Sequence, residues 1–279
     1  MRAQDAGRVV SWSLLPIGAF APLRPLASKV PAVTVVFWIT KALTTGMGES
    51  TSDYLVHTLP PVLAVALGFV ALVAALILQF RSDRYVPWRY WLAVSMVGVF
   101  GTMAADVLHV GLGVPYLVST TAFAIALAAV FVLWHKSEHT LSIHSIHTTR
   151  RELFYWAAVM ATFALGTAAG DMTAVTLHLG YLSSGVMFAA LIVIPAAGHK
   201  WFAMNAVFAF WFAYVLTRPL GASFADWMSV SHARGGLAFG PGPVSLVLAL
   251  AIVGLVANMN RAGTDMHSRG EIGVPAELD

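Results

Sequence analysis

The 279-residue sequence contains no cysteine and few charged residues. The absence of cysteine excludes disulfides, thiolate metal sites and cysteine nucleophiles. Only 10% of the residues are charged, against about 25% in soluble globular domains, and 58% are hydrophobic. The mean hydropathy is +0.77. Most of the surface therefore faces something other than water, and no basic soluble segment remains that would bind nucleic acid.

In place of charged residues, the sequence contains long apolar segments. A bilayer core about 30 Å thick needs about 20 apolar residues in a helix. Eight segments meet this requirement, at about 31–54, 60–80, 88–110, 114–135, 152–176, 181–198, 201–230 and 242–260. Lipid cannot satisfy exposed backbone polar groups, so these segments predict an all-α polytopic membrane protein with about eight transmembrane helices. In the seventh segment Pro219 follows Arg218, which predicts a kink or a break.

Basic residues occur in alternate loops. They lie in the N-terminal lead, in the loops after the second, fourth and sixth segments, and in the C-terminal tail: Arg2, Arg8, Arg24, Lys29, Arg81, Arg84, Arg89, Lys136, Arg150, Arg151, Lys200, Arg261 and Arg269. The opposite loops are short and nearly uncharged, and Arg234 is their one basic residue. The positive-inside rule therefore predicts that both termini are cytoplasmic.

Four odd-numbered segments align without a gap. Each has an aromatic residue, then Trp, then Gly ten residues after the Trp and Asp fifteen after it. The shared residues are Trp38, Trp91, Trp156 and Trp211, then Gly48, Gly101, Gly166 and Gly221, then Asp53, Asp106, Asp171 and Asp226. Because each copy is a two-helix hairpin, the four repeats are predicted to run parallel.

The repeats define the domain organisation. They span about 29–82, 83–136, 148–199 and 200–260, within a transmembrane domain at 29–260. Residues 1–28 are predicted to form an N-terminal lead, and 261–279 a disordered C-terminal tail. The repeated glycines are typical of close helix packing. The tryptophans suit either packing or an interfacial belt.

The acidic residues do not fit a packing role. An unpaired carboxylate within a span costs at least about 2.5 kcal/mol. The predicted cation- or proton-binding residues are Glu49, Asp53, Asp106, Asp171 and Asp226. The alternative for the four aspartates is a hydrogen-bonding role at the helix ends, near the outer turn.

Two basic residues in the spans are predicted charge partners. Glu49 and Asp53 are four residues apart, so they share one helix face and need a cation, a proton or a basic partner. Arg218 is predicted to pair with one of them. With Lys41, the odd spans hold five negative and two positive charges, and the excess requires protons, water or bound cations.

Histidines suggest a weaker metal hypothesis. His57 is four residues after Asp53 and His109 is three after Asp106, and such pairs can ligate a divalent metal. The competing interpretation is a histidine at the wet membrane edge. A second, loose group suits a solvated loop or a weak metal site: His135, His139, His144 and His147. No resident cofactor is predicted apart from such a divalent cation.

The segment KVPAVTVVFWITKALTTGMGESTSDYL, residues 29–55, resembles the repeat unit of a family of bacterial inner-membrane proteins. That family is catalogued as uncharacterised membrane-anchored proteins with a repeat of unknown function. The matching residues are Lys29, Pro31, Phe37, Trp38, Lys41, Thr44, Thr45, Gly48, Glu49 and Asp53. Repeats two to four lack the Lys and the Glu. The resemblance extends to about Asn260 and implies a multi-pass protein of the bacterial inner membrane, but little about activity.

The leading functional hypothesis is a small transporter or channel-like protein for a cation, either a divalent metal or a proton-coupled solute. Its expected partners are membrane lipid and a small cation or solute, and a homo-oligomer is compatible with the sequence. The alternative is a non-transporting binding or sensing protein whose buried acids form a structural network. Asp106 and Asp171 could in principle pair in an intramembrane hydrolase, but no HExxH, GxSxG, P-loop or GxGxxG motif is present. We therefore predict that the protein is not an enzyme.

Overall fold

The computed structural model describes residues 28–272, without the side chains of Val110 and of residues 262–272. This part of the chain folds into eight α-helices and contains no strand. The helices are α1 (Val35–Thr58), α2 (Pro61–Phe80), α3 (Pro87–Asp106), α4 (Tyr116–Glu138), α5 (Thr149–Asp171), α6 (Tyr181–Trp201), α7 (Ala206–Ser229) and α8 (Pro241–Ile272). The chain continues from α3 and α5 into single π-helical turns, η1 (Val107–Gly111) and η3 (Met172–Thr176). All but one residue of the predicted N-terminal lead lies outside the described residues.

Local sequence signals explain where several helices begin. The side chains of Thr34 and Thr148 accept a hydrogen bond from the first turn of α1 and of α5. Asn205 does the same at the start of α7, where its side-chain oxygen accepts from two backbone N–H groups. Pro61 and Pro87 stand at the first positions of α2 and α3, where a missing N–H costs nothing.

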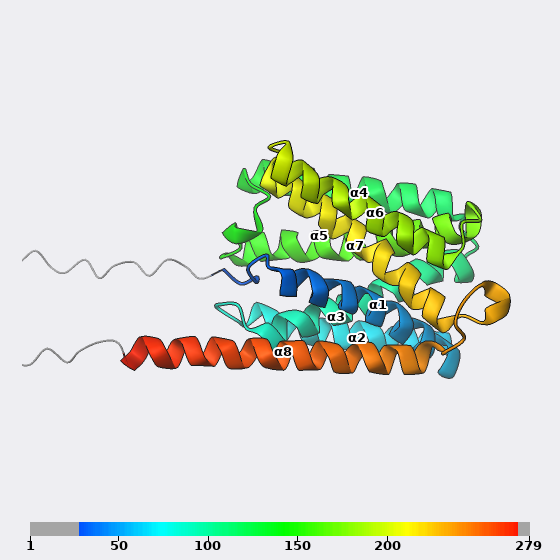
Figure 1. The fold of residues 1–279 in the computed structure, drawn as a ribbon, viewed down its shortest axis with the longest axis horizontal. Helices are drawn as coiled ribbons and strands as arrows, with labels where there is room; N and C mark the ends of the chain where they lie inside the picture. Colours follow the sequence, from blue (N-terminus) through cyan, green and yellow to red (C-terminus); the bar gives the residue numbers. More distant parts are fainter. Residues whose placement is uncertain (1–27, 273–279) are drawn as a thin grey trace, which may run out of the picture.

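The four odd-numbered helices form an inner ring. In this ring α1 contacts α3 and α7, and α5 contacts the same two helices from the opposite side. The even-numbered helices lie outside it, and each packs mainly on the first helix of the next repeat: α2 on α3, α4 on α5, α6 on α7, and α8 on α1 (Figure 1). The last repeat thus closes onto the first, and the four hairpins interlock in a closed circle.

The arrangement explains which helices face lipid. Seven of the eight helices are long and apolar enough to cross a membrane. In the outer helices 17–28% of the most apolar stretch is buried, against 56–61% in α3, α5 and α7. The exception is α1, which carries Lys41, Glu49 and Asp53, and which the neighbouring helices shield. The predicted all-helical, eight-helix membrane fold of four parallel repeats is therefore confirmed.

The repeated aromatic residues close the ring at the end where both termini emerge. The Trp of each repeat packs against the first aromatic residue of the preceding repeat. These pairs, which we call the aromatic belt, are Phe37–Trp91, Tyr90–Trp156, Tyr155–Trp211 and Phe210–Trp38, with ring centroids 5.7, 5.7, 6.1 and 5.6 Å apart. The tryptophans therefore serve packing between repeats.

The repeated glycines allow the inner helices to approach closely. A Cβ added at each glycine would collide with the residue eight positions after the first aromatic in the next repeat. The pairs are Gly48 with Gly98, Gly101 with Phe163, Gly166 with Arg218, and Gly221 with Thr45. The predicted packing role of these glycines agrees with this geometry.

Two predicted boundaries were wrong. The seventh span begins at Ala206, because Asn205 caps it, and it runs through Pro219 without a break. The helix α8 continues to Ile272, so residues 261–272 are helical and not a disordered tail. Residues 273–279 lie outside the described residues.

Candidate functional site

Arg218 lies at the centre of the inner ring and is completely buried. Its Nη2 donates hydrogen bonds to Glu49 Oε2 (2.6 Å), to Thr167 Oγ1 (2.7 Å) and to Thr102 Oγ1. Its Nη1 donates to the backbone oxygen of Thr45 (3.2 Å). One guanidinium group from α7 therefore contacts all three other inner helices, and the predicted pairing of Arg218 with Glu49 is present.

The acceptors of Arg218 share one position in the repeat. Glu49, Thr102 and Thr167 each follow the repeated glycine directly, and Ala222 stands at this position in the fourth repeat. Three copies of the repeat thus direct a polar side chain at the axis, and the fourth supplies the arginine one turn earlier. The two threonines were not among the predicted site residues. The alignment register was the signal that would have assigned them to this network.

Lys41 lies on the terminal side of this network. It is completely buried, and its Nζ has no hydrogen-bond partner in the described part of the chain. The Nζ lies 4.0 Å from the ring centroid of Phe163 and 4.2 Å from that of Tyr214. The guanidinium of Arg218 lies 5.1 Å from the same Phe163 ring. Both cations are therefore held partly by aromatic faces, and Phe163 contacts both of them.

The ring is closed beyond Lys41. The hydroxyl groups of Tyr90 and Tyr155, two members of the aromatic belt, share a hydrogen bond of 2.5 Å and are fully buried. On the same side, Lys29 of the segment before α1 forms a buried ion pair of 2.8 Å with Glu152 of α5. Gln79 of α2 donates to the other oxygen of Glu152 (2.9 Å). These contacts hold the segment before α1 against the closed end of the ring.

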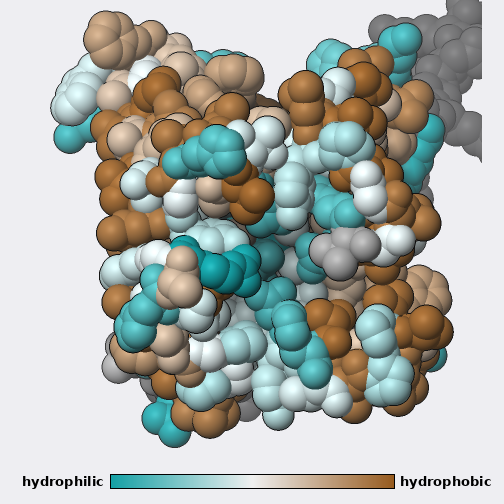
Figure 2. Space-filling model, turned by 90° about the vertical axis from the view of Figure 1, so that its right-hand side faces the viewer, coloured by the Kyte–Doolittle hydropathy of each residue, from teal (hydrophilic) through white to brown (hydrophobic). Residues whose placement is uncertain are grey.

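The four aspartates lie at the opposite end of the inner helices, which we call the aspartate end. Asp226 is 8% exposed and the other three are half-buried. Each stands four residues, about one helical turn, beyond the position of its own repeat that faces Arg218. Figure 2 views this end and shows hydrophilic residues gathered in a central recess between apolar margins. The aspartates therefore occupy one end of the axis on which Arg218 lies.

None of the four aspartate side chains forms a hydrogen bond or an ion pair with a residue between 28 and 272 whose side chain is described. They therefore do not cap helices, which was the alternative role considered for them. Asp106 and Asp171 end α3 and α5, and the backbone continues directly into the π-helical turns. Water or a ligand must therefore solvate these carboxylates.

The histidines do not join the acids. The Nδ1 of His57 bonds the backbone oxygen of Asp53 (2.6 Å), not its carboxylate, and the side chain is exposed. His109 is buried against the ring of Tyr116, with 4.4 Å between ring centroids, and both of its nitrogens lack a partner among described residues. The π-helical turn after Asp106 changes the spacing on which its predicted proximity depended. The described residues contain no group of three or more His, Asp or Glu that would hold a metal ion.

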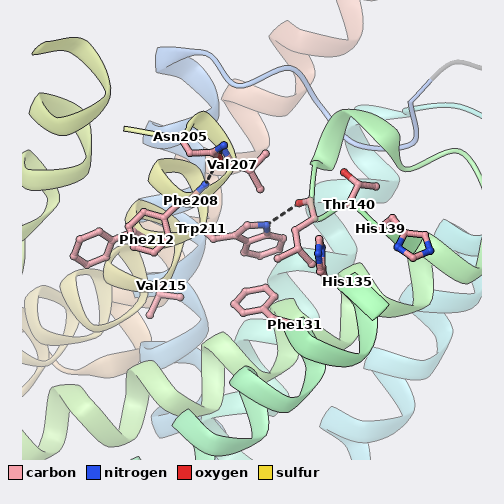
Figure 3. A pocket seen from close by; sticks show the side chains of 11 residues that line it. Phe131, His135, His139, Thr140, Asn205, Val207, Phe208, Trp211, Phe212 and Val215 are labelled. Atoms are coloured by element: carbon pink, nitrogen blue, oxygen red, sulfur yellow. Dashed lines mark hydrogen bonds between the residues drawn. The ribbon is translucent and has the colours of Figure 1, made fainter. Parts of the chain in front are cut away.

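Two further pockets lie away from the axis. One of about 580 Å³ lies between α4 and α7 and is shown in Figure 3. Aromatic residues form its floor, and Trp211 Nε1 donates to the backbone oxygen of Leu141 (3.0 Å). His135 and His139 stand at its edge. The second, of about 780 Å³, lies between α1, α6 and α7. Neither pocket is lined by any of the predicted acids or their charge partners.

Comparison with known proteins identifies a family but no activity. The family model described as Repeat of Unknown Function (DUF347) matches the chain four times, at residues 36–85, 89–140, 154–204 and 209–264. These matches follow the four hairpins of the structure. No curated protein and no solved structure matches the chain.

Proposed function

Since the chain belongs to the family built from the Repeat of Unknown Function (DUF347), whose description names no activity, we propose a function from the geometry of the axis: the protein transports a cation through the inner ring. The observation that carries this proposal is the set of unpaired aspartates at one end of the axis. They lead to a buried Glu49 that is already neutralised by Arg218.

Energetics support a functional role for the aspartates. Carboxylates at membrane depth are costly, and they persist where they face water, a partner or a transported ion. No described residue pairs with these four, and Asp226 is almost fully buried. Three of the four are only half-buried, and Figure 2 shows a recess with hydrophilic residues at this end of the bundle. Four acids around one axis therefore raise the local cation concentration at the mouth of a pathway.

The structure corresponds to a state that is closed toward the termini. Phe163, Lys41 and the aromatic belt fill the axis between Arg218 and the terminal end. Transport would therefore require part of the ring to move. The contacts between neighbouring repeats are the natural place for such a movement, since each repeat is a discrete hairpin.

The ion pair provides a coupling step. A proton or cation that reaches Glu49 would weaken its attraction for Arg218, whose Nη2 is shared among three acceptors. Released from Glu49, the guanidinium would be attracted by the aspartates. Binding at one end would thereby be linked to rearrangement at the centre, which is the requirement for coupled transport.

A second candidate is a binding protein that moves nothing across the membrane. The closed aromatic belt favours it, because such a protein needs no pathway through that end. In this case the acids would still bind a ligand at the aspartate end, but no flux would accompany binding.

Flux measurements on proteoliposomes separate the two. Purified full-length protein would be reconstituted with internal pH- and metal-sensitive dyes and exposed to gradients of Na⁺, K⁺, Mg²⁺, Mn²⁺ and H⁺, and uptake of labelled methylguanidinium would be measured in the same vesicles. We expect flux that is lost in Asp106→Asn and Glu49→Gln and retained in Asp83→Asn, an exposed loop acid at the other end. Absence of flux of any ion, in vesicles shown to contain folded protein, contradicts transport and leaves the binding protein.

The proposal also includes an orientation. We place the protein in the bacterial inner membrane with both termini in the cytoplasm, so the aspartate end faces outward. The basic residues near the terminal end support this assignment. Fusions of an alkaline phosphatase after Ala233 and after Asp279 test it: activity is expected only for the first, and activity of the second alone would reverse the orientation.

A further inference from the structure

An arginine side chain is already bound at the aspartate end. Arg234 lies in the short η4 turn (His232–Arg234) between α7 and α8 and is exposed. Its Nη2 donates to the hydroxyl of Tyr181 (2.5 Å), and its guanidinium carbon lies 5.6 Å from the Tyr181 ring centroid. The helix α6, which begins at Tyr181, also contacts the π-helical turn that directly follows Asp171. An aromatic ring and a hydroxyl group together hold an organic cation at the end of the bundle where the aspartates lie.

The repeat contains a second copy of this arrangement without an arginine. Tyr116 lies ten residues after Asp106, as Tyr181 lies ten residues after Asp171, and each is the first residue of an outer helix that follows a π-helical turn. No described residue hydrogen-bonds the hydroxyl of Tyr116. The helix α4, which begins at Tyr116, contacts both π-helical turns that directly follow Asp106 and Asp171, so Tyr116 lies at the end of the axis where the aspartates are. His109 packs against the ring and fixes its place.

The spacing of the acids argues against a bare metal ion at this place. A metal needs several ligands within about 2.0–2.6 Å of one point, and no three acids or histidines among the described residues are grouped in that way. The acids instead come from four different helices, α1, α3, α5 and α7. Asp226 is more than nine-tenths buried and lacks a partner in the described chain. Separated acceptors suit a larger cation that carries several N–H donors.

We propose that Tyr116, with Asp106, Asp171 and Asp226, forms a site for the ammonium or guanidinium group of a small organic cation, held as Tyr181 holds Arg234. If the protein is a transporter, which rests on the function proposed above, organic amines or guanidines are its substrates. Arg234 occupies the equivalent position in the third repeat as a tethered cation, and it limits the access of a second ligand.

Binding of defined probes to the full chain in detergent micelles tests the site. Methylguanidinium and putrescine would be titrated calorimetrically, with Na⁺ and Mg²⁺ at equal ionic strength as comparators. We expect saturable binding of the organic cations only. Tyr116→Leu is expected to weaken it at least tenfold, and Asp106→Asn at least threefold. Phe239→Leu, which removes an exposed aromatic ring near the same end, serves as the matched control and is expected to bind normally.

Arg234→Gln has the opposite expected effect. It frees Tyr181 and removes a repelling charge, so methylguanidinium should bind at least threefold more tightly or with a second equivalent. If Tyr116→Leu does not fold, Tyr116→Phe removes the hydroxyl alone and is expected to weaken binding about threefold, the scale of one hydrogen bond.

Three results overturn the site: equal binding of methylguanidinium and Na⁺, unchanged binding in both Tyr116 variants, or weaker binding in Arg234→Gln. The outcome is separable from that of the proposed function. Probe binding that depends on Tyr116, without any flux, supports the site and contradicts transport. Flux of inorganic cations without binding of either organic probe supports transport and contradicts the site.

Discussion

Trp38 packs against Phe210 with 5.6 Å between the ring centroids, and this contact joins the first repeat to the last. A second contact closes the ring in the same way: the outer helix α8 of the last repeat packs along α1 of the first. There the hydroxyl oxygens of Thr51 and Ser245 lie 2.6 Å apart. The ring closure is thus a set of specific contacts between residues almost two hundred positions apart, and it can be tested directly.

Because the chain has no cysteine, a disulfide can report this closure without background. Thr51→Cys combined with Ser245→Cys should cross-link α1 to α8 under mild oxidation in membranes, since the two Oγ atoms already lie near the sulfur–sulfur distance of about 2.05 Å. Cleavage in the α4–α5 loop followed by non-reducing electrophoresis measures the link. Thr51→Cys with Val193→Cys, an exposed position of α6 that also lies beyond the cleavage site, is the control that should remain uncross-linked.

A repeated glycine of the inner ring and a loosely packed glycine of α8 should respond in opposite ways to substitution by Ala. Gly166→Ala places a Cβ against the Cβ and Cγ atoms of Arg218, so it should destabilise the protein by about 1–3 kcal/mol through overpacking. Gly254→Ala, in α8, meets no atom within 4 Å and should be neutral or stabilising by about 0.5–1 kcal/mol. Thermal unfolding in detergent compares them. Equal effects of the two substitutions would contradict the close packing of the inner ring.

The buried ion pair predicts strong coupling. Arg218→Gln or Glu49→Gln alone leaves an uncompensated charge and should cost about 3–5 kcal/mol. The double variant should cost much less than the sum, which a double-mutant cycle of unfolding free energies measures. The pair Arg150–Glu138, whose arginine side chain is 68% exposed, provides the contrast and should show much weaker coupling. Additive effects of Arg218 and Glu49 would show that the pair contributes little.

Lys41 is expected to lower the stability of the protein and to be required for flux. Replacing it by Met keeps the length of the side chain and removes a buried cation that has no described hydrogen-bond acceptor, so the variant should unfold at a higher temperature than the wild type. In proteoliposomes the same variant should lose flux. A variant that melts several degrees lower would instead assign Lys41 to the structural core, through its contacts with Phe163 and Tyr214.

The repeat register predicted much of the fold and part of the site. It placed the tryptophans and glycines at equivalent positions, and the alignment of Arg218 one turn from Glu49 predicted their ion pair. Both results depend on local periodicity, which a single sequence displays. The predicted shared location of the aspartates at one helix end has the same origin.

The remaining features depend on contacts between repeats. A single sequence does not reveal that each outer helix packs on the next repeat, since a hairpin could equally pack on itself. Nor did it predict the π-helical turns after Asp106 and Asp171, in the first of which His109 packs against the ring of Tyr116. Pro219 was expected to kink or break its helix, and α7 runs through it without a break.

The circular order of the hairpins has a consequence for the chain itself. All four interfaces between repeats are of the same kind, and both ends of the described chain emerge at one side of the bundle (Figure 1). The packing therefore does not require the ends of the chain to lie between the fourth and first repeats. A circular permutant that starts before α3 and joins α8 to α1 through a flexible linker would keep every helix in place. Gene duplication could have opened this ring at any of its four joints.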